Sequence, residues 1–251
     1  MSKTLGIVHL GPRPEGLKNK LSRKLGSHSL LELVVRRVTE CQQLDGVAVV
    51  LGAGAETAAL AGLVPSNVPL HISERADLLG RLASAAEAFQ ADAVVRVCAE
   101  HPFVDPVLID RLVVTADAHP QCDYVGFCLQ NGRPASLSAL ELFGEWCRTK
   151  ALRRADAEAA SPADREQATR YLWSHPEIFP LRFIPLPHEL QREDLRSALN
   201  DDDAWEHALT IYDAVGHEDV NWRRIAGLFG GLSKRRRAAA KESGRVASSA
   251  T

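Results

Sequence analysis

Acidic and imidazole side chains follow a buried strand near the middle of the chain. The run AVVRVC at residues 93–98 is almost continuously apolar, which is typical of a strand covered on both faces in a parallel sheet. Glu100 and His101 follow it, where open α/β sheets place their ligand crevice, and Asp105 precedes Pro106 as a candidate helix N-cap. A carboxylate at such a strand end can hold a divalent metal against phosphate oxygens. The alternative is a solvated loop acid, and spacing alone leaves both interpretations open.

A basic segment follows the first predicted strand, Leu5 to Leu10. Residues 11–29 are rich in Gly, Pro, Lys and Arg and show no periodicity, so we expect a loop. Backbone N–H groups and basic side chains at such a place can bind phosphates. The segment contains neither a P-loop nor a dinucleotide fingerprint, and a solvated linker is the alternative. The candidate phosphate ligands are Arg13, Lys18, Lys20, Arg23 and Lys24.

The elements that must position these side chains alternate between strands and amphipathic helices. We expect strands at residues 5–10, 47–51, 68–72, 94–97, 123–128 and 179–187. We expect helices at residues 27–41, 77–89, 139–158, 164–173, 201–215 and 220–229, with shorter ones before residue 62 and from residue 106. This alternation predicts an α/β fold with three layers, α/β/α, around a mostly parallel central sheet.

Composition bounds the class of protein. The 251 residues are 45% hydrophobic and 25% charged, as expected of a soluble globular chain, and neither a membrane-spanning run nor a signal peptide is visible. The five cysteines lack C-x-x-C spacing, which argues against structural zinc and a disulfide framework and favours thiols in a reducing compartment. We therefore expect a cytoplasmic protein with no membrane partner.

Charge divides the chain into two parts. We expect residues 1–230 to form a single domain and residues 231–251 to form a basic, disordered tail. We do not expect nucleic acid as a partner. An interaction protein that uses the tail on nucleic acid or an acidic partner remains the alternative from another functional class.

Four segments, in order along the chain, carry a resemblance to a known family. They are HLGPRPEGLKNKLSRKLGSHSLLEL from residue 9, ADAVVRVCAEHPFVDPVLID from residue 91, ADREQATRYLWSHPEIF from residue 163 and LNDDDAWEHALTIYD from residue 199. They are similar to the family patterns ARxxSxRLPGK, ADxIVRxxGDxPLIDPxxID, EREHVTxYIxxxPExF and VDTPEDLELxxxIYE. The chain thus resembles the cytidylyltransferase superfamily that makes CMP-activated acid sugars, most closely its branch of spore coat polysaccharide biosynthesis proteins.

The resemblance implies a fold, an activity and partners. The fold is that of nucleotide-diphospho-sugar transferases, a Rossmann-like arrangement. The activity is cytidylyl transfer from CTP to a sugar or sugar acid for surface polysaccharide biosynthesis, with pyrophosphate as the leaving group. The resemblance also implies Mg²⁺ as cofactor and, because relatives often pair, a homodimer.

The resemblance also assigns roles to individual residues. Lys20 and Arg13 would act catalytically on the triphosphate, and Glu100 and Asp201 would hold Mg²⁺. The full nucleotide-binding set is Leu10, Gly11, Arg13, Lys20 and Arg81, and the substrate-binding set is His101, Glu141 and Arg165.

Several positions depart from the family pattern. Gly11 and Gly16 stand where the motif has arginines, and Glu100 stands where it has an aspartate. Ala139 aligns with a family carboxylate, which leaves Glu141 alone in that segment. Because preorganised cationic donors stabilise the transition state, their loss leaves an alternative open. That alternative is a catalytically degenerate relative that binds nucleotide, sugar nucleotide or a partner without turnover.

Overall fold

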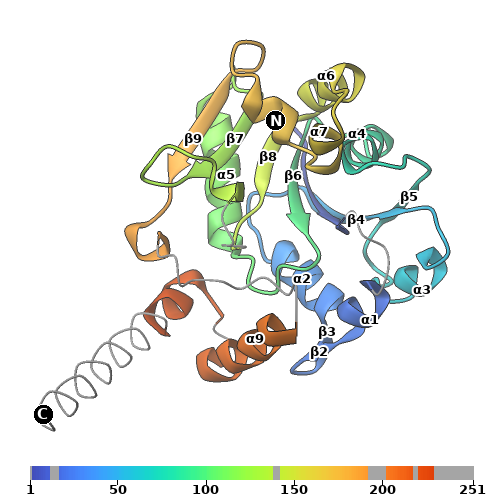
Figure 1. Ribbon diagram of the computed structural model, residues 1–251, viewed down its shortest axis with the longest axis vertical. Coiled ribbons are helices and arrows are strands. Elements are labelled where there is room, and N and C mark those ends of the chain that lie inside the picture. The colour runs from blue at the N-terminus through green and yellow to red at the C-terminus, as the bar shows by residue number, and fades with distance from the viewer. Residues whose placement is uncertain (1, 12–16, 138–141, 192–201, 217–219, 229–251) are drawn as a thin grey trace, which may run out of the picture.

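The structure is a computed structural model that describes residues 2–11, 17–137, 142–191, 202–216 and 220–228. Its centre is a seven-stranded sheet in the order β5-β4-β1-β6-β8-β7-β9 (Figure 1). The strands are β1 (Thr4–His9), β4 (Gly46–Gly52), β5 (Leu70–Ser73), β6 (Ala93–Cys98), β7 (Tyr124–Cys128), β8 (Glu145–Arg148) and β9 (Leu181–Pro185). Strand β8 runs antiparallel to both neighbours, and the other neighbouring pairs are parallel. The predicted mostly parallel sheet is therefore confirmed.

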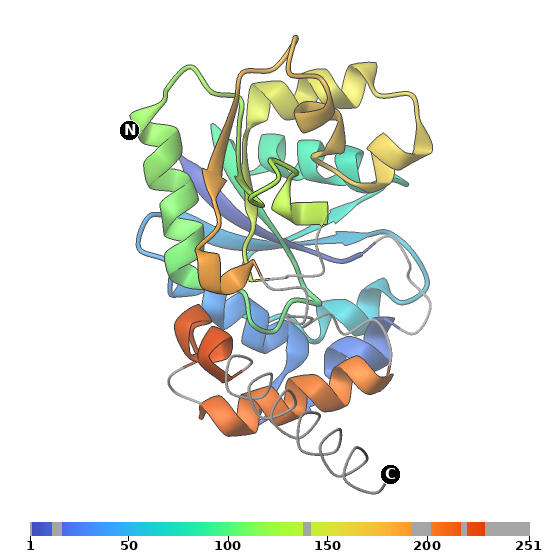
Figure 2. The same ribbon diagram turned by 60° about the vertical axis from the view of Figure 1, so that its left-hand side comes forward.

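Helices cover both faces of the sheet, as Figure 2 shows. One face packs against α4 (Leu78–Ala88), α6 (Thr149–Glu158) and α8 (Arg170–Ser174), and α7 (Pro162–Glu166) lies against α4 and α8. The other packs against α1 (Leu17–Ser22), α2 (Leu30–Thr39), α3 (Thr57–Ala61), α5 (Pro106–Ala118), α9 (Asp202–Val215) and the helical residues 222–228. In β1 the fully buried Ile7 faces the first layer and Val8 the second, which is the alternation of a strand covered on both sides.

Local sequence signals explain where the helices begin. Ser29 caps α2 by accepting from the backbone N–H of Glu32 at 3.2 Å, and Asp77 caps α4 by accepting from Gly80 at 2.9 Å. Asp105 caps α5 and also accepts from the backbone N–H of Trp222 at 2.8 Å. The last bond fastens the helical residues 222–228 to the start of α5.

The basic segment is more structured than its composition predicts. The expectation of a loop throughout residues 11–29 is wrong, because α1 (Leu17–Ser22) lies within it, followed by the short hairpin of β2 (Lys24–Leu25) and β3 (His28–Ser29). Gly26 turns the hairpin with a φ of 63°, a conformation that favours glycine. Leu21 and Leu25 are fully buried, so two isolated apolar side chains anchor the segment.

The predicted helix at residues 139–158 is also wrong in its first half. Residues 145–148 form β8 between β6 and β7, and the helix α6 begins only at Thr149. Gly144 permits this insertion, since a Cβ atom there would lie 2.6 Å from the carbonyl oxygen of Arg96. The predicted helix at 164–173 is two short helices, α7 and α8, and the strand predicted at 68–72 is β5 at 70–73.

Two expectations concern the chain as a whole. The tail at 231–251 lies outside the described residues, and the single domain at 1–230 stays a prediction. Among the helices that the structure describes, none has the length and apolar character that crossing a bilayer requires.

Candidate active site

The carboxyl ends of three parallel strands meet at one edge of the sheet. Register pairs His9 with both Val50 of β4 and Cys98 of β6, so the residues after these strands emerge side by side. Gly11 and Glu100 touch there, because a Cβ atom on Gly11 would lie 2.7 Å from Glu100 Oε1. The absence of a side chain at Gly11 therefore leaves the space that the Glu100 carboxylate occupies.

Lys20 comes to the same place from α1. Its Nζ lies 2.5 Å from Glu100 Oε2, and the two side chains are 22% and 17% exposed. An ammonium and a carboxylate in contact at a partly open strand edge are groups that can bind triphosphate oxygens and a divalent cation. Two residues 80 positions apart in sequence, each singled out by its chemistry, thus meet in space.

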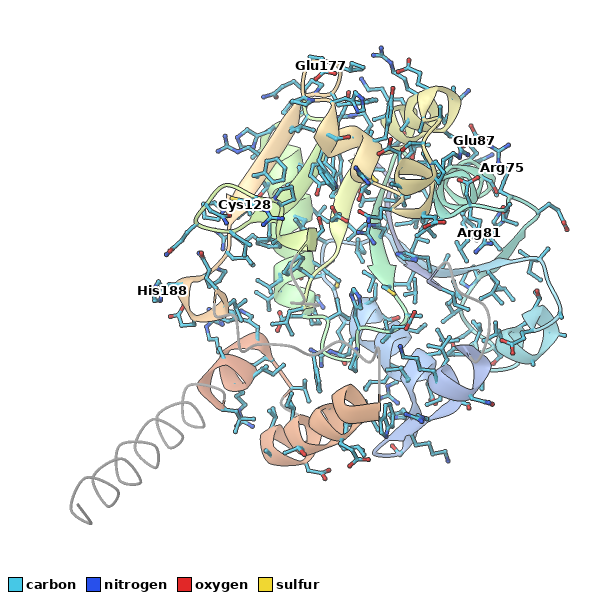
Figure 3. All side chains as sticks on the ribbon, viewed as in Figure 1. Arg75, Arg81, Glu87, Cys128, Glu177 and His188 are labelled. Atoms are coloured by element: carbon cyan, nitrogen blue, oxygen red, sulfur yellow. The ribbon has the colours of Figure 1, made fainter. Side chains whose placement is uncertain are left out.

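Arg81 reaches this edge from the first turn of α4. Its side chain covers Gly52 at the end of β4, where a Cβ atom would lie 2.5 Å from the guanidinium carbon. Its Nε and one terminal nitrogen donate to the carbonyl oxygens of Arg75 and Ala76 at 2.9 and 2.7 Å. Figure 3 shows Arg75 and Arg81 near α4. Arg81 thereby holds together the turn that leads from β5 into α4.

Arg165 lies in a different cluster, between α7 and α4. Its guanidinium contacts Asp77 at 3.0 Å and Asp156 at 2.5 Å, and the bond to Asp77 raises the pKa of Arg165. Burial acts to raise the pKa of Asp77, but the bonds from Arg165 and Gly80 outweigh it and the pKa is lowered. The described contacts of Arg165 thus join helices, and its predicted role toward substrate stays a prediction.

His101 lies next to Glu100, in the turn after β6. Its backbone N–H donates to the carbonyl oxygen of Cys98 at 3.2 Å, and its own carbonyl oxygen accepts from Val104 at the same distance. The side chain is partly buried at the same edge as Lys20. His101 therefore belongs to the turn that carries Glu100, and its predicted role toward substrate stays a prediction.

Three predicted site residues, Arg13, Glu141 and Asp201, lie outside the described residues. Within the part of the chain that the structure describes, no three His, Cys, Asp or Glu side chains gather as a ready-made metal cage. A cation at Glu100 would therefore depend on substrate oxygens and water for most of its ligands, which is the usual situation of Mg²⁺.

Sequence reasoning missed a buried polar cluster beneath the site. Arg96 of β6 forms an ion pair with Glu145 of β8, and Tyr124 donates to the same carboxylate. Thr169 donates to Glu145 at 2.8 Å, and Arg96 donates to His9 Nε2 at 3.2 Å. One signal was available, since Arg96 interrupts the apolar run of a strand buried on both faces. Glu145 gave no such signal because it fell inside the predicted helix.

Electrostatics in this cluster follow from burial and pairing. Burial and, after it, the nearby Arg96 lower the pKa of His9 to about 3, so the ring is neutral at physiological pH. Burial acts to lower the pKa of Arg96, but Glu145 outweighs it and the pKa is raised. Burial and Glu145 together raise the pKa of Tyr124 well above its usual value, so its hydroxyl remains a donor.

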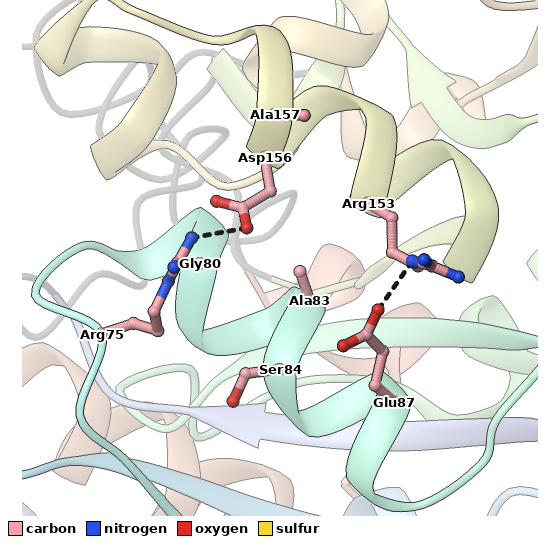
Figure 4. Close-up of a pocket in the computed structure, with 8 residues that line it drawn as sticks. All are labelled: Arg75, Gly80, Ala83, Ser84, Glu87, Arg153, Asp156 and Ala157. Atoms are coloured by element: carbon pink, nitrogen blue, oxygen red, sulfur yellow. Dashed lines mark hydrogen bonds and ion pairs between the residues drawn. The ribbon is translucent and has the colours of Figure 1, made fainter.

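A polar groove of about 310 Å³ opens between α4 and α6 (Figure 4). Its charges pair across the groove, with Arg75 at 2.6 Å from Asp156 and Arg153 at 2.7 Å from Glu87. These ion pairs therefore link α4 and the turn before it to α6. Neither Lys20 nor Glu100 lines the groove.

Comparison with known proteins shows the family of the chain. The sequence matches the MobA-like NTP transferase domain over residues 10–205, which is most of the chain. The chain belongs to this family. The membership confirms the nucleotidyltransferase resemblance, and the matched region includes Leu10, Lys20, Glu100 and Arg165.

Two sequence relatives cover most of the chain. It is 27% identical over 199 residues to an uncharacterized protein of Methanocaldococcus jannaschii, covering 79% of this chain and 78% of that protein. It is 23% identical over 222 residues to the spore coat polysaccharide biosynthesis protein SpsF of Bacillus subtilis, covering 86% and 89%. The spore coat branch named by the sequence patterns is thus present among its relatives.

Solved structures of nucleotidyltransferases share the fold. A cytidylyltransferase from Leptospira borgpetersenii superposes with a TM-score of 0.80 at 16% identity, covering 93% of this chain and 96% of that one. A CMP:2-keto-3-deoxy-manno-octonic acid synthetase complexed with CTP gives 0.63 at 11% identity, covering 84% and 98%. A Mycobacterium tuberculosis protein complexed with manganese gives 0.56 at 15% identity, covering 83% and 99%. At these identities the likeness establishes the fold.

Proposed function

We propose that this protein transfers a cytidylyl group from CTP to a sugar or sugar acid that serves surface polysaccharide biosynthesis. The observation that carries the proposal is the contact of Lys20 with Glu100 beside Leu10 and Gly11, at the carboxyl edge of the sheet. The likeness to a cytidylyltransferase and to a synthetase complexed with CTP supports cytosine as the base. The relative named for spore coat polysaccharide biosynthesis supports the class of acceptor.

The reaction requires the protein to position the acceptor and the triphosphate and to offset the negative charge on the phosphates. An oxygen of the acceptor forms a bond to the α-phosphorus of CTP while the bond to pyrophosphate breaks. Lys20, partly exposed and carried by α1, would donate to triphosphate oxygens and offset the charge that builds on the leaving pyrophosphate. Arg13, outside the described residues, and Arg81 would complete the cationic side of the site.

A divalent cation fits the carboxylate side of the site. Glu100 Oε2 already accepts a positive group at 2.5 Å in the form of the Lys20 ammonium, so the carboxylate is placed to hold a cation. When bound, Mg²⁺ neutralises charge on phosphate oxygens and favours departure of pyrophosphate. Glu100 would be its ligand from the described residues, with Asp201 as the second predicted ligand and phosphates and water supplying the rest.

A second candidate function is nucleotide binding without turnover, and the contact between Gly11 and Glu100 favours it. The family arginine expected at position 11 is replaced by glycine, and a Cβ atom added there would lie 2.7 Å from Glu100 Oε1. The guanidinium of Arg81 is held by two carbonyl oxygens, and Arg165 is held by two carboxylates. These contacts reduce the cationic groups that are ready to stabilise a transition state.

Calorimetric titration with CTP and Mg²⁺, beside ATP, GTP and UTP, tests the proposal. It is paired with a pyrophosphate-release assay over sugar acids and sugar phosphates. We expect CTP-selective binding that is at least tenfold weaker in Lys20→Ala, since a hydrogen bond to a charged group contributes about 1.5 to 3 kcal/mol. Lys150→Ala, which removes a 73% exposed lysine from α6, is the matched control. CTP binding without pyrophosphate release would favour the second candidate, and absence of nucleotide binding would refute both.

A further inference from the structure

A continuous polar chain runs from the interior of the sheet to the base of the site. Glu145 pairs with Arg96, Arg96 Nη1 lies 3.2 Å from His9 Nε2, and His9 Nδ1 lies 3.3 Å from the carbonyl oxygen of Leu10. All these side chains lie on the sheet face covered by α4 and α6, and His9 is only 2% exposed. The chain ends on the peptide that joins Leu10 to Gly11.

The two partners of His9 determine its tautomer. A guanidinium has only donors, so the Nε2 atom that faces Arg96 must accept. A carbonyl oxygen only accepts, so the Nδ1 atom that faces Leu10 must carry the proton. Both contacts demand the same neutral form, with hydrogen on Nδ1. The positive charge of Arg96 also opposes a second proton on the ring.

This tautomer orients the backbone of the site. The bond from Nδ1 holds the Leu10 carbonyl toward the His9 ring. The peptide bonds of the described residues include no cis form, and in a trans peptide the N–H points opposite to the preceding carbonyl. The Gly11 N–H is therefore turned away from the His9 ring, on the strand edge that also carries Glu100.

Arg96 is itself held by more than its ion pair. Thr169 accepts from Arg96 Nε at 3.3 Å and donates to Glu145 at 2.8 Å, while Tyr124 donates to the other carboxylate oxygen. A buried charge pair of this kind is stable only when its remaining donors and acceptors are satisfied. The guanidinium therefore presents a fixed donor to His9.

We propose that His9, Arg96 and Glu145 are positioning residues that orient the Leu10–Gly11 peptide for nucleotide binding. Arg96 and Glu145 act through His9, and His9 acts through the Leu10 carbonyl, so none of the three needs to touch the nucleotide. The inference rests on the proposed nucleotide-binding function of this edge, and it adds the residues that give the backbone its orientation.

The tautomer can be measured without any ligand. In protein with ¹⁵N-labelled histidine, NMR at neutral pH should show one buried ring with a protonated Nδ1 and a lone pair on Nε2. We expect this pattern to weaken in Arg96→Gln, because the side-chain amide offers an acceptor as well as donors to the ring and no longer requires Nε2 to accept. A His9 ring in the opposite tautomer, or one that is charged at neutral pH, would overturn the proposal.

Two substitutions of His9 separate positioning from general stability. Asn places an amide near Nδ1 and can still donate to Leu10, whereas Gln places its amide near Nε2 and can still accept from Arg96. We expect His9→Gln to weaken CTP binding about tenfold and His9→Asn to retain most of the affinity, with similar melting temperatures. An affinity that is equal in both variants, or that falls only in proportion to stability, would contradict the positioning role.

A buried arginine on the opposite face of the sheet is the matched control. Arg37 donates from Nε to the carbonyl oxygen of Val104 at 2.6 Å and from Nη2 to that of Val220 at 2.9 Å. Arg37→Lys should lower the melting temperature and leave the His9 ¹⁵N signals unchanged. If the unaltered protein binds no nucleotide, the proposed function fails. If it binds CTP and His9→Gln binds equally well, only the positioning role fails.

Discussion

Lys20 forms an ion pair with the Glu100 carboxylate, which is the group that a metal ion would bind. The Lys20 ammonium lies 2.5 Å from Glu100 Oε2, so a cation that binds this oxygen must displace it. Once CTP is present, its phosphates offer Lys20 another anionic partner. Removing the positive charge of Lys20 should therefore strengthen metal binding in the free protein and weaken binding of the nucleotide.

The size of the first effect follows from the geometry. Coulomb's law gives about 1.7 kcal/mol for unit charges 2.5 Å apart, even at the dielectric constant of water. Desolvation and ordering of two partly exposed side chains offset much of this attraction, which leaves about 0.5 to 1 kcal/mol. Lys20→Met should accordingly bind Mn²⁺ about two- to fivefold more tightly than the unaltered protein in the absence of nucleotide.

Titration of Mn²⁺ followed by electron paramagnetic resonance measures the free ion directly and needs no turnover. Lys24→Met removes an exposed positive charge from the neighbouring hairpin and should change the Mn²⁺ affinity much less. Glu100→Gln should abolish the gain when combined with Lys20→Met. If Lys20→Met bound Mn²⁺ as weakly as the unaltered protein, Glu100 would not be the metal ligand and the reasoning would be refuted.

Three further predictions test other parts of the structure. First, the free energy of unfolding should decrease as the pH is lowered below about 6.5. His9 gains a proton there in the unfolded chain, whereas the buried ring, with a pKa of about 3, does not. Urea unfolding between about pH 4 and 7 should show a contribution of up to about 1.4 kcal/mol per pH unit that His9→Asn removes. Second, Arg165→Leu should lower the free energy of unfolding by about 1 to 2 kcal/mol because it leaves Asp77 and Asp156 without their shared partner. Arg153→Leu breaks only an exposed pair with Glu87 and should cost less than about 1 kcal/mol; equal losses would contradict the bridging role. Third, Gly11→Ala should weaken CTP binding in the unaltered background and much less beside Glu100→Asp, because the added Cβ meets the longer carboxylate at 2.7 Å. Calorimetry of the four combinations gives this coupling, and additive losses would contradict it.

The sequence predicted the parts of the site that depend on local patterns. A buried apolar run followed by Glu100 gave the strand end, and the N-cap Asp105 before Pro106 marked the start of a helix that the structure confirms. These features depend on residues within one or two turns of each other. Their physics is therefore visible before the chain folds.

The buried cluster could not be predicted in the same way. Arg96 and Glu145 lie 49 residues apart and meet only because β8 inserts between β6 and β7. The residues of β8 are followed directly by the ten-residue helix α6. The helical periodicity of α6 is the stronger signal, so the sequence alone assigns the four residues of β8 to the helix. Gly144 allows the chain to approach β6 closely, because a Cβ atom there would lie 2.6 Å from the carbonyl oxygen of Arg96. No local sequence pattern indicates this approach.

Two departures from the family pattern, at positions 11 and 100, lie side by side in the structure. Along the sequence, glycine in place of arginine at position 11 and glutamate in place of aspartate at position 100 look like independent losses. In the structure the longer carboxylate lies against the α-carbon side of Gly11 and reaches Lys20 at 2.5 Å. An arginine at position 11 would begin in the space that the Glu100 carboxylate fills, so Glu100 in this position excludes it. The contact of Lys20 with Glu100 therefore supplies a cation at the strand edge where the family arginine of position 11 is absent.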